Sequence, residues 1–240
     1  MTDVAYGTAV GLIRAIIFDL DDTLWDCRPV ILRAEQVLLD FLRSRYARVT
    51  ELHDVDSMRA LRAQIAREHP AMGHDFTWLR MESLRRHARE AGYDEAMADE
   101  AFEVFYRARN DVVLYEDVRP ALDRLVGEYR LFAISNGNAN LGAIGLDHYF
   151  EASLAAREAG MLKPDPRIFD LLLQRARLRP QEAAHVGDDP VADVEGARRA
   201  GLLPVWVNRA GFPWTLDSTA PDVTIASLGE LPEALHRAPR

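Results

Sequence analysis

The sequence predicts an α/β protein in which a doubly wound parallel sheet forms the core and an all-helical cap domain is inserted into it. Short apolar runs alternate with helical patterns, which is typical of parallel βαβ units. Two of these runs, Ile13–Asp19 and Ala184–Gly187, end at acidic residues, and open α/β sheets bind ligands at the carboxyl ends of their strands. Between residues 30 and 110 the periodicity is helical, which indicates an insert of about 85 residues.

Composition and charge restrict the class of protein. The chain has 240 residues, 48% hydrophobic and 28% charged, with a net charge of −9. Such a chain is typical of a globular protein, and its negative charge argues against general binding to nucleic acid or to membrane surfaces. No signal peptide or membrane-spanning stretch is evident, so a cytoplasmic location is expected. Cys27 is the only cysteine, which excludes an internal disulfide.

The first half of the chain is expected to contain the first strand and the cap. Met1–Leu12 lacks periodicity and is expected to be a loose lead-in. The β-branched apolar run of Ile13–Asp19 suits a strand buried on both faces. From Asp26 the pattern is helical, with Pro29 suited to a first helical turn. Further cap helices are predicted at Asp56–Glu68, Thr77–Ala91 and Glu95–Arg109.

Alternation of strands and helices returns after residue 111. Helices are predicted at Arg119–Val126, Pro166–Ala176 and Asp193–Ala200. Strands are predicted at Arg130–Ser135, Ala152–Ala156, Ala184–Gly187, Pro204–Val207 and Val223–Ala226. The expected domains are therefore a core of residues 1–25 and 113–240 and a cap of residues 26–112.

The stretch Asp19–Thr23 holds the first candidate functional residues. Asp19 and Asp21 are two residues apart at a strand end, so both can face one pocket. Repelling carboxylates beside a core are costly unless a cation compensates them, and hard oxygen ligands suit Mg²⁺. The carboxylate of Asp19 and the backbone carbonyl of Asp21 are predicted metal ligands. The alternative is a solvated turn that Thr23 caps.

Ser135, Asn136 and Lys163 belong to two later segments. Ser135 and Asn136 end the strand that follows the cap, where a hydroxyl and loop amides can bind phosphate oxygens. Their alternative role is a helix N-cap. Lys163 is the only lysine among 29 basic residues. A fixed ammonium group near carboxylates can hold a transferring phosphoryl group, whereas the alternative is an ordinary surface lysine.

A second acidic group follows the apolar run at Ala184–Gly187. Asp188 is the predicted third metal ligand, because it comes directly after this strand. Asp189 and Asp193 are predicted supporting residues that orient Lys163 or a metal-bound water. The alternative is a turn in which Asp189 caps the next helix.

The four groups together, in this order, resemble the motifs of the haloacid dehalogenase-like (HAD) hydrolase superfamily. The motifs correspond to Asp19–Thr23, Ser135, Lys163 and Gly187–Asp193, and the helical insert resembles the superfamily's C1-type cap. The resemblance covers essentially the whole chain. It implies a Rossmann-like HAD core and a Mg²⁺-dependent phosphatase, that is, a phosphoric monoester hydrolase.

The resemblance also implies a role for each motif residue. Asp19 would attack phosphorus and form an aspartyl-phosphate. Asp21 would protonate the leaving alcohol and then activate water. Mg²⁺ and Lys163 would neutralise charge on the transferring group, while the cap closes over the site. The expected catalytic residues are Asp19, Asp21 and Lys163, and the expected substrate-binding residues are Thr23, Ser135, Asn136 and Lys163.

Individual residues favour one subclass. The haloacid dehalogenases lack the second aspartate of the first motif, so Asp21 favours a phosphatase. Phosphonatases of the superfamily use a cap lysine, and this cap contains none. Stretches including Arg28–Glu35 and Gly73–Leu84 resemble bacterial HAD phosphatases that act on flavin mononucleotide (FMN). The same enzymes act on 5-amino-6-(5-phospho-D-ribitylamino)uracil, an intermediate of riboflavin biosynthesis.

A flavin or pyrimidine ring would need an aromatic or arginine plane to pack against. Trp25, Phe76, Trp78 and Arg80 are the candidates for that plane. The alternative places Phe76 and Trp78 in the core of the cap.

Other functions fit the same motifs. One alternative is a broad sugar-phosphate or nucleotide phosphatase, and another is a non-catalytic phospho-accepting or binding protein. A receiver module is about half this length and lacks a large insert, which argues against it. The expected partner is a small phosphorylated metabolite, and the sequence leaves open the oligomeric state and the role of residues 207–214. The histidines His53, His69, His74 and His148 share no metal-ligand spacing and are expected to be surface or cap residues.

Overall fold

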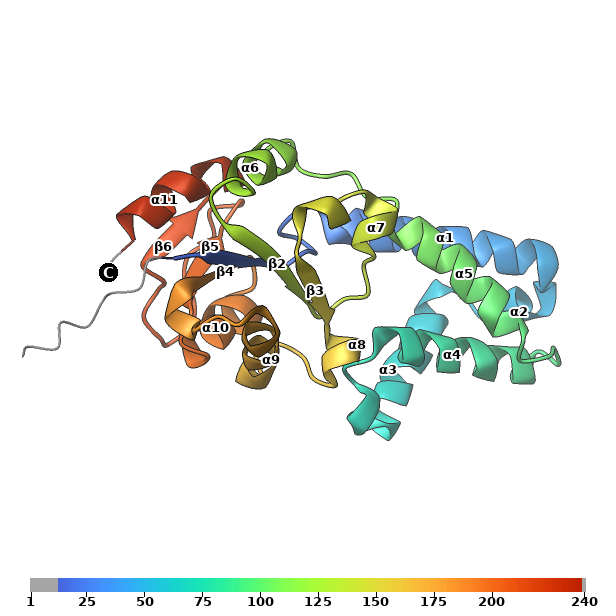
Figure 1. Cartoon of the computed structure of the whole chain (residues 1–240). Coiled ribbons are helices and arrows are strands. Elements are labelled where there is room, and N and C mark those ends of the chain that lie inside the picture. The colour runs from blue at the N-terminus through green and yellow to red at the C-terminus, as the bar shows by residue number, and fades with distance from the viewer. Residues whose placement is uncertain (1–12, 239–240) are drawn as a thin grey trace, which may run out of the picture.

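The computed structural model describes residues 13–238 and contains a six-stranded parallel sheet with helices on both faces (Figure 1). The strand order is β3-β2-β1-β4-β5-β6. The strands are β1 (Ala15–Phe18), β2 (Arg130–Ser135), β3 (Ala152–Ala155), β4 (Ala183–Gly187), β5 (Leu203–Val207) and β6 (Val223–Ile225). This order confirms the predicted doubly wound α/β fold. Because β1 lies between β2 and β4, the segments that follow these three strands meet at one edge of the sheet.

Two apolar layers cover the faces of the sheet. Ile16 and Phe18 of β1 belong to one layer and Ile17 to the other, as the alternation of side chains in a strand requires. Both faces of β1 are buried, which explains its continuous apolar run. The helices over the first face are α6 (Val118–Leu125) and α11 (Leu231–Arg237), and those over the second are α9 (Pro166–Ala176) and α10 (Gly196–Arg199) (Figure 1).

The segment between β1 and α6 is helical, as expected, and lies beside the sheet (Figure 1). Its helices are α1 (Cys27–Arg45), α2 (Ala47–Leu52), α3 (Val55–Glu68), α4 (Phe76–Glu90) and α5 (Met97–Arg109). They surround an apolar core of their own that includes Leu38, Leu84 and Phe105. The sequence did not indicate α2, because Val49 is its one buried residue and leaves no apolar periodicity to detect.

The segment after β4 departs from the prediction of a helix at Asp193–Ala200. The chain coils earlier, in the π-helical segment η4 (Pro190–Glu195), and continues as α10. The earlier start follows from Asp189, whose carboxylate accepts hydrogen bonds from the backbone N–H groups of Val191 and Ala192. The alternative considered for Asp189, a helix cap, is therefore what its side chain does.

The remaining short elements connect these units. They are η1 (Pro70–Met72), α7 (Leu141–Ile144), η2 (Asp147–Tyr149), α8 (Ala156–Ala159), η3 (Pro180–Glu182) and η5 (Leu228–Glu230). Within residues 13–238, none of the helices combines the length and the apolar character needed to cross a membrane. The expected lead-in at Met1–Leu12 lies outside the described residues.

Candidate active site

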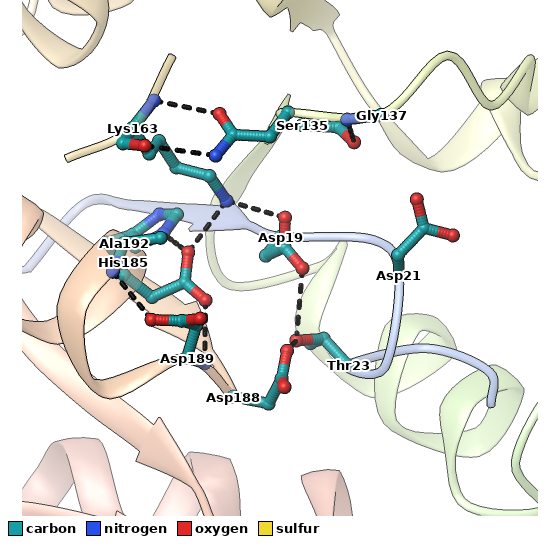
Figure 2. A network of polar contacts seen from close by, with 12 residues as sticks. Asp19, Asp21, Thr23, Ser135, Gly137, Lys163, His185, Asp188, Asp189 and Ala192 are labelled. Atoms are coloured by element: carbon teal, nitrogen blue, oxygen red, sulfur yellow. Dashed lines mark hydrogen bonds and ion pairs between the residues drawn. The ribbon is translucent and has the colours of Figure 1, made fainter. Parts of the chain in front are cut away.

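A cavity of about 410 Å³ lies at the carboxyl ends of β1, β2 and β4, between the sheet and the cap. It is lined by residues singled out in the sequence, among them Asp19, Asp21, Ser135, Lys163, Asp188 and Asp193. Three helices of the cap also line it, through Ile31, Phe76 and Arg109. The parallel sheet thus brings four separate sequence segments into one cavity, where Figure 2 shows their side chains.

Lys163 places a buried ammonium group in this cavity. Its Nζ lies 2.5 Å from Oδ1 of Asp19 and 2.7 Å from Oδ1 of Asp193, and Figure 2 shows its ammonium group directed at Asp19. Burial alone would lower the pKa of Lys163, but these two carboxylates raise it above its ordinary value. The side chain is 1% exposed. Lys163 is therefore not an ordinary surface lysine, and it carries its charge at the bottom of the cavity.

Asn136 fixes the backbone from which Lys163 extends. Its Oδ1 accepts a hydrogen bond from the Lys163 N–H at 2.8 Å, and its Nδ2 donates to the Lys163 carbonyl at 3.0 Å. Both polar ends of the amide are used in this way. The substrate-binding role predicted for Asn136 stays a prediction, and the structure gives the residue a positioning role.

Three carboxylates crowd the same place. Asp19, Asp188 and Asp193 place oxygen atoms within 4.8 Å of one another. Burial raises the pKa of Asp19 well above its ordinary range, and burial together with the charge of Asp193 raises the pKa of Asp188 to about 7. Burial also opposes ionisation of Asp193, yet Lys163 and His185 outweigh it and lower the pKa of that carboxyl. The single ammonium group of Lys163 therefore cannot balance the negative charge of all three carboxylates.

This donor set fits Mg²⁺. The ion prefers hard oxygen ligands, and its charge would relieve the repulsion that keeps the pKa values of Asp19 and Asp188 high. The carboxylates of Asp19 and Asp188 and the backbone carbonyl of Asp21 stay the predicted ligands. Asp193 is held by Lys163 and by Nε2 of His185 at 2.8 Å, which suits a supporting role.

Mg²⁺ affinity is expected to depend on pH because of Asp188. With the pKa of this carboxyl raised to about 7, the ion must displace a proton at lower pH. The affinity should therefore rise by about tenfold per pH unit below 7 and level off above it. Calorimetric Mg²⁺ titrations from about pH 5.5 to 8.5 measure this slope. An affinity that is constant over the range would contradict the role of Asp188, and Asp188→Asn should make the slope shallower and remove most of the binding.

Two hydroxyl groups belong to this site: Ser135 lines the cavity, and Thr23 lies buried beside its carboxylates. Thr23 is fully buried, and its Oγ1 donates to Oδ1 of Asp188 at 3.2 Å, with Oδ2 of Asp19 at 3.5 Å. It therefore bridges two predicted metal ligands, and direct contact with substrate stays a prediction. Oγ of Ser135 accepts the N–H of Gly137 at 2.9 Å, which leaves its own O–H to donate to a phosphoryl oxygen.

Arg109 is a cavity residue that the sequence reasoning missed. Its Nη2 lies 2.8 and 2.6 Å from the two carboxylate oxygens of Asp21, and Nε1 of Trp25 donates to the same carboxylate at 2.9 Å. Nε of Arg109 also donates to Oδ1 of Asn138 at 3.3 Å. Arg109 is the last residue of α5 and only 1% exposed, so a cap helix orients the predicted acid–base residue of the core. No local signal separates it from the other cap arginines.

His185 is the second residue that was missed. It lies within β4, is 1% exposed, and its Nε2 contacts Oδ1 of Asp193. The ring packs edge-on against Phe169 with 4.9 Å between centroids. A histidine inside an otherwise apolar strand was the available signal. Asp189 takes part in the same network through its backbone N–H, which donates to Oδ2 of Asp193 at 3.0 Å.

The four ring-binding candidates are dispersed. Phe76 lines the cavity and is 45% exposed. Trp25 is buried and bonded to Asp21, while Trp78 packs edge-on against His69 with 5.2 Å between centroids. The guanidinium of Arg80 stacks 3.5 Å from the ring centroid of Phe105 in the cap core. Among the four, Phe76 is therefore the residue placed to meet a ligand in the cavity.

Comparison with known proteins finds phosphatases among the relatives of this chain. The chain is 35% identical over 202 residues to the 5-amino-6-(5-phospho-D-ribitylamino)uracil phosphatase YigB of Escherichia coli K12, covering 82% of this chain and 84% of that protein. It is 33% identical to the phosphoserine phosphatase of Thermus thermophilus, covering 92% of this chain and all of that protein. These relatives support the expected phosphatase class.

Solved structures share the fold. A 2-haloacid dehalogenase from Pseudomonas syringae pv. tomato DC3000 is similar with a TM-score of 0.89 and 38% identity, covering 94% of this chain and 99% of that chain. A HAD phosphatase from Thermococcus onnurineus is similar with a TM-score of 0.67 and 26% identity, covering 93% and 98%. The family model described as haloacid dehalogenase-like hydrolase matches residues 13–201. The chain therefore belongs to the haloacid dehalogenase-like hydrolase family, as the motifs had indicated.

Proposed function

We propose that this protein is a Mg²⁺-dependent phosphomonoester hydrolase that acts through an aspartyl-phosphate on Asp19. The observation that supports this most strongly is the pairing of Asp19 with the buried ammonium of Lys163, 2.5 Å away, inside a cavity that also holds Asp21. A carboxylate nucleophile, a fixed cation and a second carboxyl for proton transfer are what phosphoryl transfer to an aspartate requires.

Each side chain then has a defined task. Asp19 attacks phosphorus, and Lys163 fixes the direction of that carboxylate and balances the charge of the incoming phosphoryl oxygens. The hydroxyl of Ser135 donates to one of these oxygens. Mg²⁺, when bound, supplies further neutralisation of the charge on the transferring group. Asp21 gives a proton to the leaving alcohol and takes one from the water that releases phosphate.

For the substrate we propose FMN or 5-amino-6-(5-phospho-D-ribitylamino)uracil. The name of the E. coli relative, 35% identical, supports this choice. In the cavity, Phe76 and Ile31 of the cap offer an apolar wall opposite the carboxylates. A heteroaromatic ring can pack on such a wall while its phosphate lies at Lys163. The broad sugar-phosphate or nucleotide phosphatase is the alternative.

A phosphate-release assay with Mg²⁺ tests both the proposed reaction and the proposed substrate. The panel should contain FMN, the riboflavin precursor, sugar phosphates, nucleotides and phosphoserine, together with a 2-haloacid monitored by halide release. We expect phosphate release that EDTA abolishes, with the highest kcat/KM on the two ring-bearing substrates. Similar kcat/KM values for all the phosphate esters would support the broad sugar-phosphate or nucleotide phosphatase. Halide release without phosphate release would contradict the phosphatase proposal.

Phe76→Ala is expected to weaken recognition of the leaving group. Loss of one exposed aromatic face should raise KM for FMN by about tenfold and leave kcat within about twofold, because the phenyl ring of Phe76 has no group that donates or accepts a proton. Trp78→Ala is the matched control, since Trp78 packs against His69. Steady-state kinetics with FMN and with a ringless sugar phosphate measure the difference. Equal KM values for wild type and Phe76→Ala would remove the ring-packing role.

Arg109→Met is expected to affect esters according to their leaving group. Without the guanidinium, the Asp21 carboxyl loses two contacts and keeps only the hydrogen bond from Nε1 of Trp25, so its direction is less firmly fixed. For FMN, whose alkoxide must be protonated, kcat/KM, which reports the steps up to departure of the leaving group, should fall by about 10- to 100-fold. For p-nitrophenyl phosphate, whose phenolate leaves unassisted, kcat/KM should change by less than about threefold. A uniform loss on both esters would indicate a merely structural role for Arg109.

A further inference from the structure

A second group of metal-ligating side chains lies within the cap, outside the cavity. It consists of His53, His87 and Glu90, whose ligand atoms lie within 4.8 Å of one another. His53 directly follows α2, and the other two belong to the last turn of α4, three residues apart and therefore on one helix face. Figure 1 shows α2 at the end of the helical layer that is farthest from the sheet. This group is therefore separate from the carboxylates of the active site.

The environment of His87 requires an explanation. It is fully buried, and neither of its ring nitrogens has a hydrogen-bond partner among the described residues. Buried polar groups are nearly always paired, and an unpaired one indicates a missing ligand or a strained site. Its ring centroid lies 4.3 Å from that of His53, so its nitrogens adjoin the other two candidate ligands.

The remaining geometry suits a tetrahedral ion. Nε2 of His53 lies 3.1 Å from Oε2 of Glu90. Two ligands of a tetrahedral Zn²⁺ ion, each about 2.0–2.1 Å from the metal, are about 3.3 Å apart. The Glu90 side chain is 58% exposed, which gives an ion access from solvent and leaves room for a water as fourth ligand. The neighbouring Arg62 shares the carboxylate of Glu35 with Arg59, at 2.5 Å from each guanidinium group, so its positive charge is only partly balanced.

We propose that His53, His87 and Glu90 form a Zn²⁺ site that joins the end of α2 to the end of α4. Two imidazoles and a carboxylate favour zinc over Mg²⁺, which prefers all-oxygen ligands. The ion would satisfy one nitrogen of His87 and link two helices that are otherwise in limited contact. Its effect is on the stability of the cap, because an ion that binds only the folded form shifts the unfolding equilibrium.

The test uses the full-length, Mg²⁺-saturated protein, which keeps the carboxylates of the active site occupied. After incubation with Zn²⁺ and gel filtration, we expect one zinc per chain by elemental analysis and a higher Tm than in the zinc-free protein. Bound Co²⁺ should show the intense visible bands of tetrahedral coordination. His87→Phe should lower zinc affinity by about 100-fold or more and remove the Tm increase.

Two further variants make the result decisive. His53→Asn removes a ligand from a less buried position, so it tests the site even if His87→Phe fails to fold. His148→Ala removes an exposed imidazole from the core domain and should bind zinc like wild type. Wild type that retains no zinc would overturn the proposal. Zinc that remains on His53→Asn but is lost in Asp188→Asn would overturn it as well, because the ion would then occupy the active site.

Discussion

Asp19→Asn is expected to abolish phosphate release, with kcat lowered by at least about 10⁴-fold in a protein that remains folded. The amide has the shape of the carboxylate but cannot attack phosphorus. It also removes the charge that pairs with Lys163, which keeps a second partner in Asp193 at 2.7 Å. The midpoint of thermal unfolding should therefore change by only a few degrees. Single-turnover phosphate release and thermal unfolding monitored by circular dichroism measure the two effects.

Asp22→Asn provides the matched control for this substitution. Asp22 has a φ of 62°, a left-handed conformation that Asn adopts readily, and its Oδ1 accepts the backbone N–H of Cys27 at 2.8 Å. Asn keeps that acceptor, so we expect activity within about threefold of wild type. If Asp19→Asn kept more than about one hundredth of the activity, another group would have to be the nucleophile.

Lys163→Met is expected to cause the largest combined loss. Met has a similar length but no charge, so Asp19 and Asp193 remain buried without their cation. Breaking a buried ion pair on one side typically costs about 3–5 kcal/mol, and phosphoryl transfer loses its fixed positive charge. We expect a stability loss of that order at pH 7 and no measurable turnover. Urea unfolding at equilibrium measures the first effect.

The loss in Lys163→Met should depend on pH in a defined direction. The pKa of Asp193 is lowered in the folded protein, where Lys163 and His185 outweigh the effect of burial. That stabilisation is present above the unfolded pKa of about 3.9 and is lost as the pH falls through the lower folded value. The difference in unfolding free energy between wild type and Lys163→Met should thus be largest at neutral pH and shrink in acid.

A double variant separates charge from packing. In Lys163→Met/Asp193→Asn, one of the two unpaired carboxylates is gone, so part of the lost stability should return without any return of activity. If the double variant were less stable than Lys163→Met by the full cost of Asp193→Asn alone, the two side chains would not interact, and the buried ion pair would have no energetic role.

Residue patterns along the chain were sufficient to predict the fold and the positions at which the strands end. The run Ile16–Phe18 is apolar because both faces of β1 are buried, and it stops at Asp19 because the strand ends there at the cavity. Parallel strands bring their carboxyl ends to one edge, so the order of the motifs along the chain already implied that Asp19 and Asp188 would meet. The helix α2 was not indicated because it buries little, and η4 started early because Asp189 caps it.

The acidic residues of the cavity were thus identifiable from local sequence, since Asp19 and Asp188 each follow an apolar strand. Contacts between the cap and the core were decided by tertiary packing. The pairing of Arg109 with Asp21 joins residues 88 positions apart, and nothing near either residue distinguishes this partner from other cap arginines. The choice of Phe76 rather than Trp78 for the cavity wall depends likewise on how α4 is rotated against α5 and α3. Periodicity identifies which residues share a helix face, but the packing of whole helices decides what that face meets.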